Sequence, residues 1–262
     1  MLSSPPMLLS LALLAAFTCP EDQKLRLDLK EWKAAMLAAT PGSDEQHYAL
    51  AALRFQSVPG NDAPEADCAD KPVLEGVDIF DANLTGMKDK LVQARFRVCK
   101  GDKENDTHAL RIAAVVPLPG GQLCKLGGED LSIDQRASDR PCENPGKLPR
   151  TLDFVELTKA GRRVVQTKDQ SGSCADPAGS TSAIRTVFFE AQGAALRKIF
   201  EAQLYDATTQ AQGRQLVART KLSFGKTFPK QISVQRCVEG ASACEDPDVY
   251  EYAPAGGKYV RK

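Results

Sequence analysis

The sequence predicts an α+β protein that is mostly antiparallel β, with a short N-terminal helical hairpin followed by a disulfide-stapled β meander, sandwich or barrel. Hydrophobic residues recur at helical spacings before residue 56, and in most of the later runs they alternate as in half-buried strands. Short turns rather than crossover helices join these runs, as expected of antiparallel strands. The chain also contains 8 cysteines and no C-x-x-C pair, and dispersed cysteines in an exported protein form disulfides.

Residues 1–18 have the features of a secretory signal peptide. They carry no charged side chain, and Met7 to Phe17 is a run of apolar and small residues broken only by Ser10. Such a run is too short to span a bilayer as a helix, but it fits a signal peptide that is cleaved after Thr18. We therefore expect an extracytoplasmic protein, periplasmic or secreted, without a transmembrane span.

Cysteine chemistry gives two further expectations. Cys19 is a candidate site for a lipid anchor, because a lipoprotein signal places its lipidated cysteine at this point. However, Thr18 stands where such signals normally have Gly, Ala or Ser, and simple secretion is the favoured interpretation. Cys237 and Cys244 bracket a short turn and are the most secure disulfide pair, whereas the connectivity of the other cysteines cannot be deduced from the sequence.

The first folded segment, residues 19–56, is expected to be helical. Apolar residues recur at spacings of three and four between residues 21 and 39, namely Leu25, Leu29, Trp32 and Met36. Ser43 and Gln46 then form a capping-box pattern that opens a second helix, which runs through Phe55. The proline-containing residues 57–72 are interpreted as a linker.

Residues 73–262 are expected to form one antiparallel β domain of about eight to ten strands. Its clearest elements are two hairpin pairs, residues 92–98 with 110–118 and residues 152–158 with 162–168. The loop-rich residues 127–150 should mark an edge of the sheet or a boundary within it. Residues 194–207 fit both a helix and a strand, and the turn before them favours the strand.

Charge is balanced over the whole chain. The 34 Lys and Arg residues equal the 34 Asp and Glu residues, so global charge gives no argument for nucleic acid as a partner. Residues 207–238 contain six basic side chains and no acid, and residues 239–251 contain five acids and no base. We expect these segments to be solvated faces that complement each other across adjacent strands. A basic surface for an anionic partner is the alternative.

The most distinctive segment is an Asp-rich turn that precedes the strand at residues 92–98. Oxygen-bearing side chains recur at every second residue, Gly86 permits a sharp turn, and a second carboxylate follows three residues later. Calcium binds six to eight oxygens, and a tight loop with alternating short side chains can supply most of them. The predicted metal ligands are Asp81, Asn83, Thr85, Met87 and Asp89.

This turn resembles the Asp-rich loop of FG-GAP/VCBS repeats, the blades of integrin-like propellers, written roughly D-x-[DN]-x-D-G-x-x-D. Asp81, Asn83, Gly86 and Asp89 match the pattern, and Thr85 stands where the family prefers Asp. The resemblance covers this one loop and implies a calcium site. With two carboxylates such a site would be weak, and an ordinary polar turn, in which Gly86 supplies a positive φ, is the favoured alternative.

These observations support three hypotheses about function. The first is an exported non-enzymatic protein, a β-rich binding or envelope-associated module, monomeric, with an unknown protein or glycan partner. The second is an exported hydrolase that uses carboxylates such as Asp81 and Asp89 for acid/base chemistry. The third, a propeller blade, is disfavoured because the Asp-rich loop occurs once in the sequence and a propeller needs several blades.

Overall fold

The computed structural model describes residues 17–58, 72–99, 107–135, 150–173, 181–209 and 215–262. Its described elements are two α-helices, two short 3₁₀-helices and fifteen strands. None of the helices in these ranges combines the length and the hydropathy that a membrane-crossing helix needs.

The N-terminal half contains both α-helices and the first seven strands. In chain order these elements are η1 (Glu21–Gln23), β1 (Lys24–Arg26), α1 (Leu29–Ala38), α2 (Asp44–Ala52), β2 (Val73–Asp81), β3 (Lys90–Cys99), β4 (Thr107–Leu118), η2 (Pro119–Gly121), β5 (Gln122–Lys125), β6 (Gly127–Gly128) and β7 (Ile133–Gln135). The elements described after residue 149 are all strands: β8 (Arg150–Val155), β9 (Val164–Ser173), β10 (Thr181–Gln192), β11 (Ala195–Thr209), β12 (Gln215–Phe224), β13 (Ile232–Val238), β14 (Asp248–Ala253) and β15 (Lys258–Arg261).

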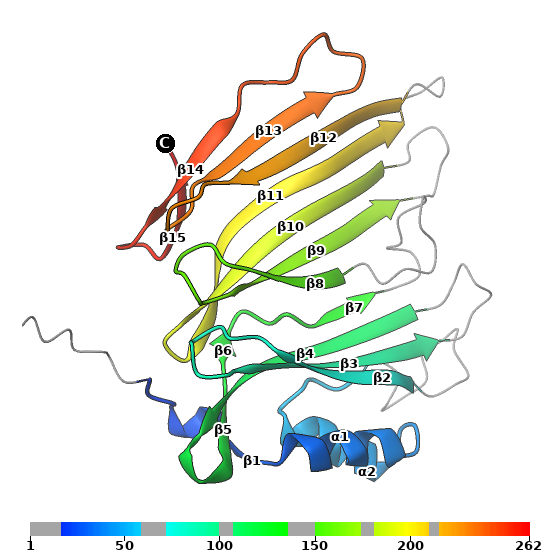
Figure 1. Cartoon of the computed structure of the whole chain (residues 1–262). Coiled ribbons are helices and arrows are strands. Elements are labelled where there is room, and N and C mark those ends of the chain that lie inside the picture. Colours follow the sequence, from blue (N-terminus) through cyan, green and yellow to red (C-terminus); the bar gives the residue numbers. More distant parts are fainter. Residues whose placement is uncertain (1–16, 59–71, 100–106, 136–149, 174–180, 210–214) are drawn as a thin grey trace, which may run out of the picture.

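The strands form two sheets that lie one above the other in Figure 1. The six-stranded sheet has the order β1-β5-β4-β3-β2, and β7 also pairs with β4. The nine-stranded sheet is a meander from β8 to β15, and β6 also pairs with β11. Among the described strands, all pairings are antiparallel except the two-residue β6–β11 pair. The predicted antiparallel fold is therefore confirmed, although the described strands outnumber the expectation because several are very short.

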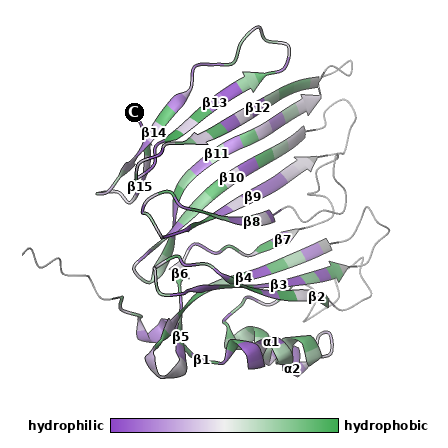
Figure 2. Cartoon of the chain, in the orientation of Figure 1, coloured by the Kyte–Doolittle hydropathy of each residue, from purple (hydrophilic) through white to green (hydrophobic). Residues whose placement is uncertain are grey.

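Three hydrophobic clusters hold these layers together. The first lies between the helices and the six-stranded sheet and contains Trp32, Met36 and Phe96. The second joins the two sheets through Leu110, Ile112 and Phe189, among others. The third lies within the nine-stranded sheet, where the C-terminal hairpin curls back so that β15 lies against β11. Figure 2 shows the apolar residues running along β3, β4, β10 and β11, which is where these clusters meet the sheets.

The N-terminal segment differs from the expectation of one long helix from residue 21. Its first residues form η1 and then β1, which adds an edge strand to the six-stranded sheet by pairing with β5. The helix begins only at Leu29, because the Asp28 side chain accepts hydrogen bonds from the Lys30 and Glu31 amides and caps it. The second helix agrees with the prediction at its start, since Ser43 caps it by accepting the Gln46 amide.

Of the loop-rich residues 127–150, the structure describes 127–135 and 150. The chain leaves the six-stranded sheet after β5, touches the nine-stranded sheet through β6, returns through β7 and enters the nine-stranded sheet with β8. The expected edge of one sheet, or boundary within it, is thus the passage between two sheets. The hairpin β3–β4, the pair β8–β9 and the strand assignment for residues 194–207, which is β11, are confirmed.

Two disulfides lie in the described residues. Cys237–Cys244 confirms the predicted pair, and Cys19–Cys124 joins the start of the described chain to β5 across a sequence separation of 105 residues. Both Cys19 and Cys124 are buried. The proposed lipid anchor conflicts with this arrangement, because the sulfur that would carry the lipid is bonded to Cys124. Cys68, Cys142, Cys174 and the side chain of Cys99 lie outside the described residues.

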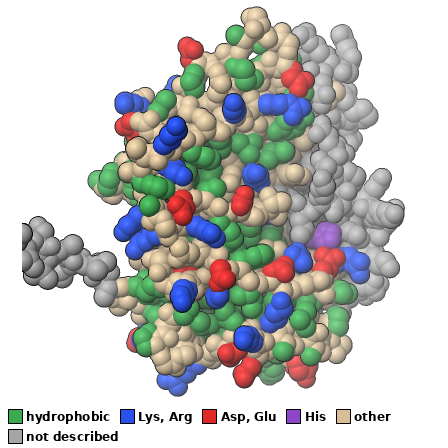
Figure 3. All heavy atoms as spheres, in the orientation of Figure 1, with side chains coloured by type: hydrophobic (Ala, Val, Ile, Leu, Met, Phe, Trp, Pro, Cys, Tyr) green, Lys and Arg blue, Asp and Glu red, His purple; other side chains and the backbone are tan. Residues whose placement is uncertain are grey.

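The surface carries interspersed charges of both signs, as the face in Figure 3 shows. Arg219 pairs with Glu239 at 3.1 Å and Arg236 pairs with Glu245 at 3.0 Å. These contacts join the basic segment at residues 207–238 to the acidic segment that follows it. The prediction that the two segments complement each other is therefore confirmed for these pairs.

Candidate functional site

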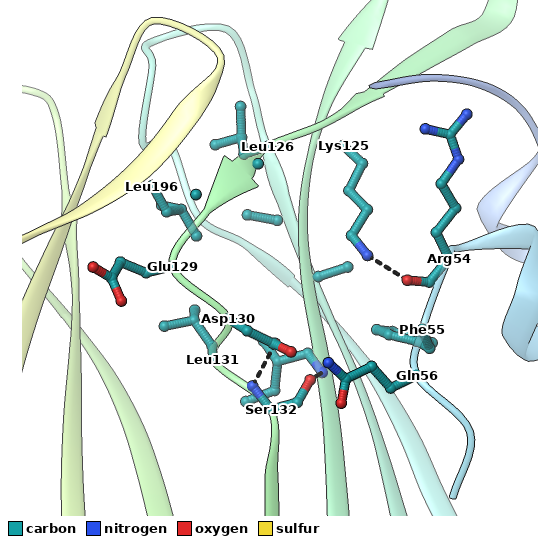
Figure 4. A pocket seen from close by; sticks show the side chains of 15 residues that line it. Arg54, Phe55, Gln56, Lys125, Leu126, Glu129, Asp130, Leu131, Ser132 and Leu196 are labelled. Atoms are coloured by element: carbon teal, nitrogen blue, oxygen red, sulfur yellow. Dashed lines mark hydrogen bonds between the residues drawn. The ribbon is translucent and has the colours of Figure 1, made fainter. Parts of the chain in front are cut away.

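The structure contains a crevice at the edge of β4, between the two sheets. On this edge β4 pairs with β7 from His108 to Leu110 and with β5 from Val115 to Leu118, so residues 111–114 have no strand partner there. The crevice, of about 250 Å³, opens over this gap (Figure 4). We call it the junction crevice; it is lined by Arg54, Phe55, Gln56, Ile112, Ala113, Ala114, Lys125, Leu126, Gly127, Gly128, Glu129, Asp130, Leu131, Ser132 and Leu196.

The first wall of the junction crevice is the segment from residue 126 to residue 132. It is carried away from β4 because it pairs with the start of β11: the Gly127 amide donates to Ala194 O at 2.9 Å, and the Glu129 amide donates to Leu196 O at 3.0 Å. Gly128 has a φ of +86°, and a Cβ there would lie 2.2 Å from Leu196 O. Glycine is therefore required for this close approach.

Arg150 of β8 fixes the same wall from the other side. Its guanidinium donates to the carbonyls of Leu131 and Ser132 and to both carboxylate oxygens of Asp169 on β9. Arg150 and Asp169 are both largely buried. A buried charge pair whose remaining donors are also satisfied holds its neighbours in one geometry, so the wall is tied to the nine-stranded sheet.

The second wall is the chain that leaves α2. The helix ends in a Schellman motif, in which the Arg54 amide donates to Ala51 O at 2.8 Å and the Phe55 amide donates to Leu50 O at 3.0 Å. Arg54 occupies the left-handed position with a φ of +51°, where glycine is usual. This turn directs the Arg54 carbonyl and the Phe55 ring toward the crevice (Figure 4).

Arg111 anchors the second wall to β4. Its side chain is 1% exposed, and it donates to Gln56 O at 3.2 Å, to Ser57 O at 2.6 Å and to Asp134 Oδ1 at 2.6 Å. One buried cation thus joins the chain after α2, strand β4 and strand β7. Both walls of the junction crevice are therefore built before any ligand arrives.

Lys125 provides the positive charge of the crevice. Its ammonium donates to Arg54 O at 2.7 Å and lies 5.6 Å from the centre of the Phe55 ring. Burial lowers the pKa of Lys125, and the nearby Asp130 carboxylate opposes that shift. Within the described part of the chain, Lys125 forms no ion pair within 4.0 Å. The ammonium is thus half-buried with one neutral hydrogen-bond acceptor and one aromatic ring as its close partners.

The Asp130 and Ser132 side chains accept hydrogen bonds from backbone amides of the crevice itself. Asp130 Oδ1 accepts the Ser132 amide at 2.9 Å, and Ser132 Oγ accepts the Ile112 amide at 3.1 Å. The Glu129 side chain points away from the crevice (Figure 4). The lining includes no histidine, cysteine or tyrosine, and the Ser132 hydroxyl is engaged by the Ile112 amide.

The predicted Asp-rich turn lies elsewhere, where β2 passes to β3. Gly86 has the expected positive φ of +90°, and Ala82 and Leu84 are buried in the cluster between the sheets. Asn83 Nδ2 donates to Gly161 O at 2.6 Å, and Asn83 O accepts the Arg163 amide at 3.1 Å. The turn therefore docks the six-stranded sheet onto the β8–β9 turn.

The two carboxylates of this turn have different partners. Asp81 is exposed and pairs with Lys90, whose hydrogen bond lowers the pKa of Asp81. Asp89 is fully buried and accepts from both the amide and the hydroxyl of Thr85. Met87 is partly exposed. No group of three or more His, Cys, Asp or Glu side chains in the described ranges is placed to hold a metal. Calcium binding at this turn stays a prediction, and any ion there would compete with Lys90 and Thr85.

Sequence reasoning did not single out the junction crevice. Lys125 ends a short strand and has an ordinary sequence environment, so only the folded chain reveals its burial. Two signals were nevertheless present. Gly127-Gly128 directly follows a strand, and Arg111 interrupts the apolar run of β4. A cation inside a strand that is buried on both faces must find partners, because an unpaired buried charge is very costly.

Comparisons with protein-family models, with curated proteins and with solved structures gave no match for this chain. The FG-GAP/VCBS resemblance of the Asp-rich turn therefore remains a prediction from one loop, and function must be argued from the geometry of the chain itself.

Proposed function

We propose that this chain is an exported, non-enzymatic binding protein, periplasmic or secreted, and that the junction crevice is its ligand site. The observation that carries the proposal is the pair of preformed walls. Arg150 holds one wall and Arg111 holds the other, so the gap beside β4 is kept open by buried charges. Small-molecule sites are typically preformed and mostly apolar, with a few convergent polar groups. The crevice shares the preformed walls, and its lining combines apolar side chains such as Ile112 and Leu131 with polar ones such as Lys125.

Export is supported by cysteine chemistry. Disulfides persist in oxidising compartments, and the described residues contain Cys19–Cys124 and Cys237–Cys244. We expect the exported chain to begin at Cys19 and to carry a free amino terminus without lipid. Mass spectrometry of the mature protein tests this expectation, and an acylated Cys19 would contradict it because its sulfur could not also bond to Cys124.

Binding at the crevice is tested with the only tryptophan of the chain, Trp32. Its ring centre lies 6.1 Å from that of Phe55, which lines the crevice. A panel of small ligands should therefore include compounds that change Trp32 fluorescence and raise the thermal midpoint of the protein.

The matched variant for this test is Gln56→Phe. Gln56 is exposed on the rim, and its backbone carbonyl, which accepts Arg111, is unchanged by the substitution. The larger ring should occupy the opening and abolish binding of the compounds that bind the parent. Gln203→Phe, on the exposed face of β11, is the control and should bind them normally. Equal binding by Gln56→Phe and the parent would place the ligand site elsewhere.

The hydrolase alternative has no specific contact in its favour. It relied on Asp81 and Asp89 acting as a pair, but Asp81 is an exposed partner of Lys90 and Asp89 is buried against Thr85. A general acid or base must reach the proton that it transfers, and a fully buried Asp89 does not.

A further inference from the structure

We propose that the junction crevice binds a small carboxylic acid with a short apolar body, and that Lys125 is the residue that binds its carboxylate. This inference rests on the proposed function and adds the chemical class of the ligand.

The first argument is charge complementarity. Lys125 is half-buried, yet its close partners are the neutral Arg54 carbonyl and the Phe55 ring. Removing an ammonium from water is costly unless a counter-charge replaces the lost hydration. An ammonium can donate three hydrogen bonds, so an incoming carboxylate can be accommodated beside the Arg54 carbonyl. Asp130 acts on Lys125 only from beyond ion-pair distance, since no carboxylate of the described residues lies within 4.0 Å of the ammonium, and the Glu129 side chain points away.

The second argument concerns the part of the crevice that a ligand body would contact. Ile112, Ala114, Leu126, Leu131 and Leu196 contribute buried apolar side chains to the lining. These side chains are at most 4% exposed, so the crevice presents only their edges. An inorganic anion makes no apolar contact with these edges, whereas a short hydrocarbon chain does. The lining therefore favours a ligand with one charged end and one apolar end.

The third argument is size. The crevice volume of about 250 Å³ is below the roughly 300–1,000 Å³ of pockets for drug-sized ligands. A short straight or branched acid fits this space, whereas a long-chain fatty acid does not. Hexanoate is accordingly the probe for the test.

The test measures the dissociation constants of four probes by Trp32 fluorescence and by calorimetry, on the full chain with its disulfides formed. Hexanoate is the expected ligand. Hexanamide has the same shape without charge, hexylamine has the opposite charge, and inorganic phosphate is an anion without an apolar body. A charge-assisted hydrogen bond contributes roughly 1.5–3 kcal/mol, so hexanoate should bind about 10- to 100-fold more tightly than hexanamide.

Variants then assign the effect to one residue. Lys125→Met keeps an unbranched side chain, one atom shorter, and removes its charge. It should weaken hexanoate binding about 10- to 100-fold and hexanamide binding much less, because the neutral amide loses no charge-assisted partner. Lys125→Arg should retain most of the preference for hexanoate. Lys221→Met makes the same charge change on the exposed part of β12 and should have no effect. Because hexanamide binding reports the integrity of the crevice, loss of packing is distinguished from loss of charge.

Several results would overturn the inference. Equal affinity for hexanoate and hexanamide, or unchanged hexanoate binding by Lys125→Met, would remove the role of Lys125. Stronger binding of hexylamine would identify Asp130 as the charge that selects the ligand. Phosphate binding as tight as hexanoate binding would remove the role of the apolar lining. In each of these cases the crevice still binds a ligand, whereas binding that survives Gln56→Phe would contradict the proposed function itself.

Discussion

The six-stranded and the nine-stranded sheet are stabilised in different ways. In the six-stranded sheet, β3 and β4 are buried on both faces, and the buried cation Arg111 joins three segments of chain. In the outer part of the nine-stranded sheet, β12 to β14 are mostly half-exposed or exposed, and their charges form surface pairs such as Arg219–Glu239, which are 66% and 56% exposed.

This difference explains where a preformed site can be built. Buried contacts and long-range links hold a wall in one geometry, whereas exposed pairs and local links leave a strand free to open at a low energetic cost. The junction crevice lies beside the buried β4, at the point where both sheets contribute to its walls. The following predictions test this contrast, from the largest expected effect to the smallest.

The two disulfides should differ in their contribution to stability. Cys19–Cys124 closes a separation of 105 residues and Cys237–Cys244 closes one of 7. On the loop-entropy estimate, replacing both members of the first pair by serine should lower the free energy of unfolding by about 4.7 kcal/mol, against about 2.5 kcal/mol for the second pair. Denaturant unfolding measures both. A larger loss for the Cys237–Cys244 pair would reverse the comparison.

Buried and exposed arginines should also differ in how much they contribute to stability. Arg111→Ala leaves the Gln56 and Ser57 carbonyls without their donor and should cost about 1–3 kcal/mol of unfolding free energy, while the 45% exposed Asp134 side chain can be solvated. Arg219→Ala removes an exposed pair with Glu239 and should cost about 1 kcal/mol or less. Chemical denaturation of the two variants in parallel gives the answer. Similar losses of unfolding free energy would show that burial does not distinguish how the two sheets are stabilised.

The Asp-rich turn allows a third comparison, between Asp89 and Asp81. Asp89→Ala removes the buried acceptor of both Thr85 bonds and should cost about 1–3 kcal/mol of unfolding free energy, whereas Asp81→Ala, at an exposed site, should change stability little. Thermal unfolding with excess calcium and with a chelator also tests the calcium prediction. Calcium at 100 times its dissociation constant should add about 2.7 kcal/mol. If calcium does not raise the unfolding temperature of the parent protein, this turn serves only as a structural contact between the sheets.

The smallest expected effect is a loss of stability at alkaline pH, caused by tyrosines of the C-terminal hairpin. Burial, together with the hydrogen bond to Glu190, raises the pKa of Tyr252 to about 12, and burial also raises the pKa of Tyr259. The unfolded chain loses these protons near pH 10, so the stability that they contribute is present below about pH 10 and is lost as the pH rises toward 12. Tyr252→Phe should reduce this loss, as measured by denaturant midpoints across that range. A pH profile unchanged by Tyr252→Phe would show that this tyrosine does not contribute.

The local patterns of the sequence predicted most of the strands correctly. Alternation identified β3, β4, β8, β9 and the C-terminal hairpin, because a half-buried strand must place alternate side chains on opposite faces. The same reasoning missed β1, since three residues next to a helix carry too little periodicity. The turn before residue 194 decided correctly between helix and strand for β11, where the periodicity alone was ambiguous.

The candidate site was much less accessible to sequence reasoning. The Asp-rich turn attracted attention because its pattern is local, whereas the junction crevice combines residues 54–56, 112–114, 125–132 and 196. Lys125 becomes distinctive only when the sheets pack and partly bury it. The same limit applies to Cys19, because its disulfide partner Cys124, which conflicts with the lipid-anchor hypothesis, cannot be deduced from the sequence.

By itself the sequence determined the antiparallel β class, the helical hairpin and the Cys237–Cys244 bridge, because each depends on residues close together in the chain. The tertiary structure decided the division into two sheets, the partner of Cys19 and the place of the junction crevice. These features depend on contacts between distant segments, such as Arg111 with Ser57 and Gly127 with Ala194. Such contacts are selected by packing and by the need to satisfy buried polar groups, and neither requirement can be evaluated along the chain alone.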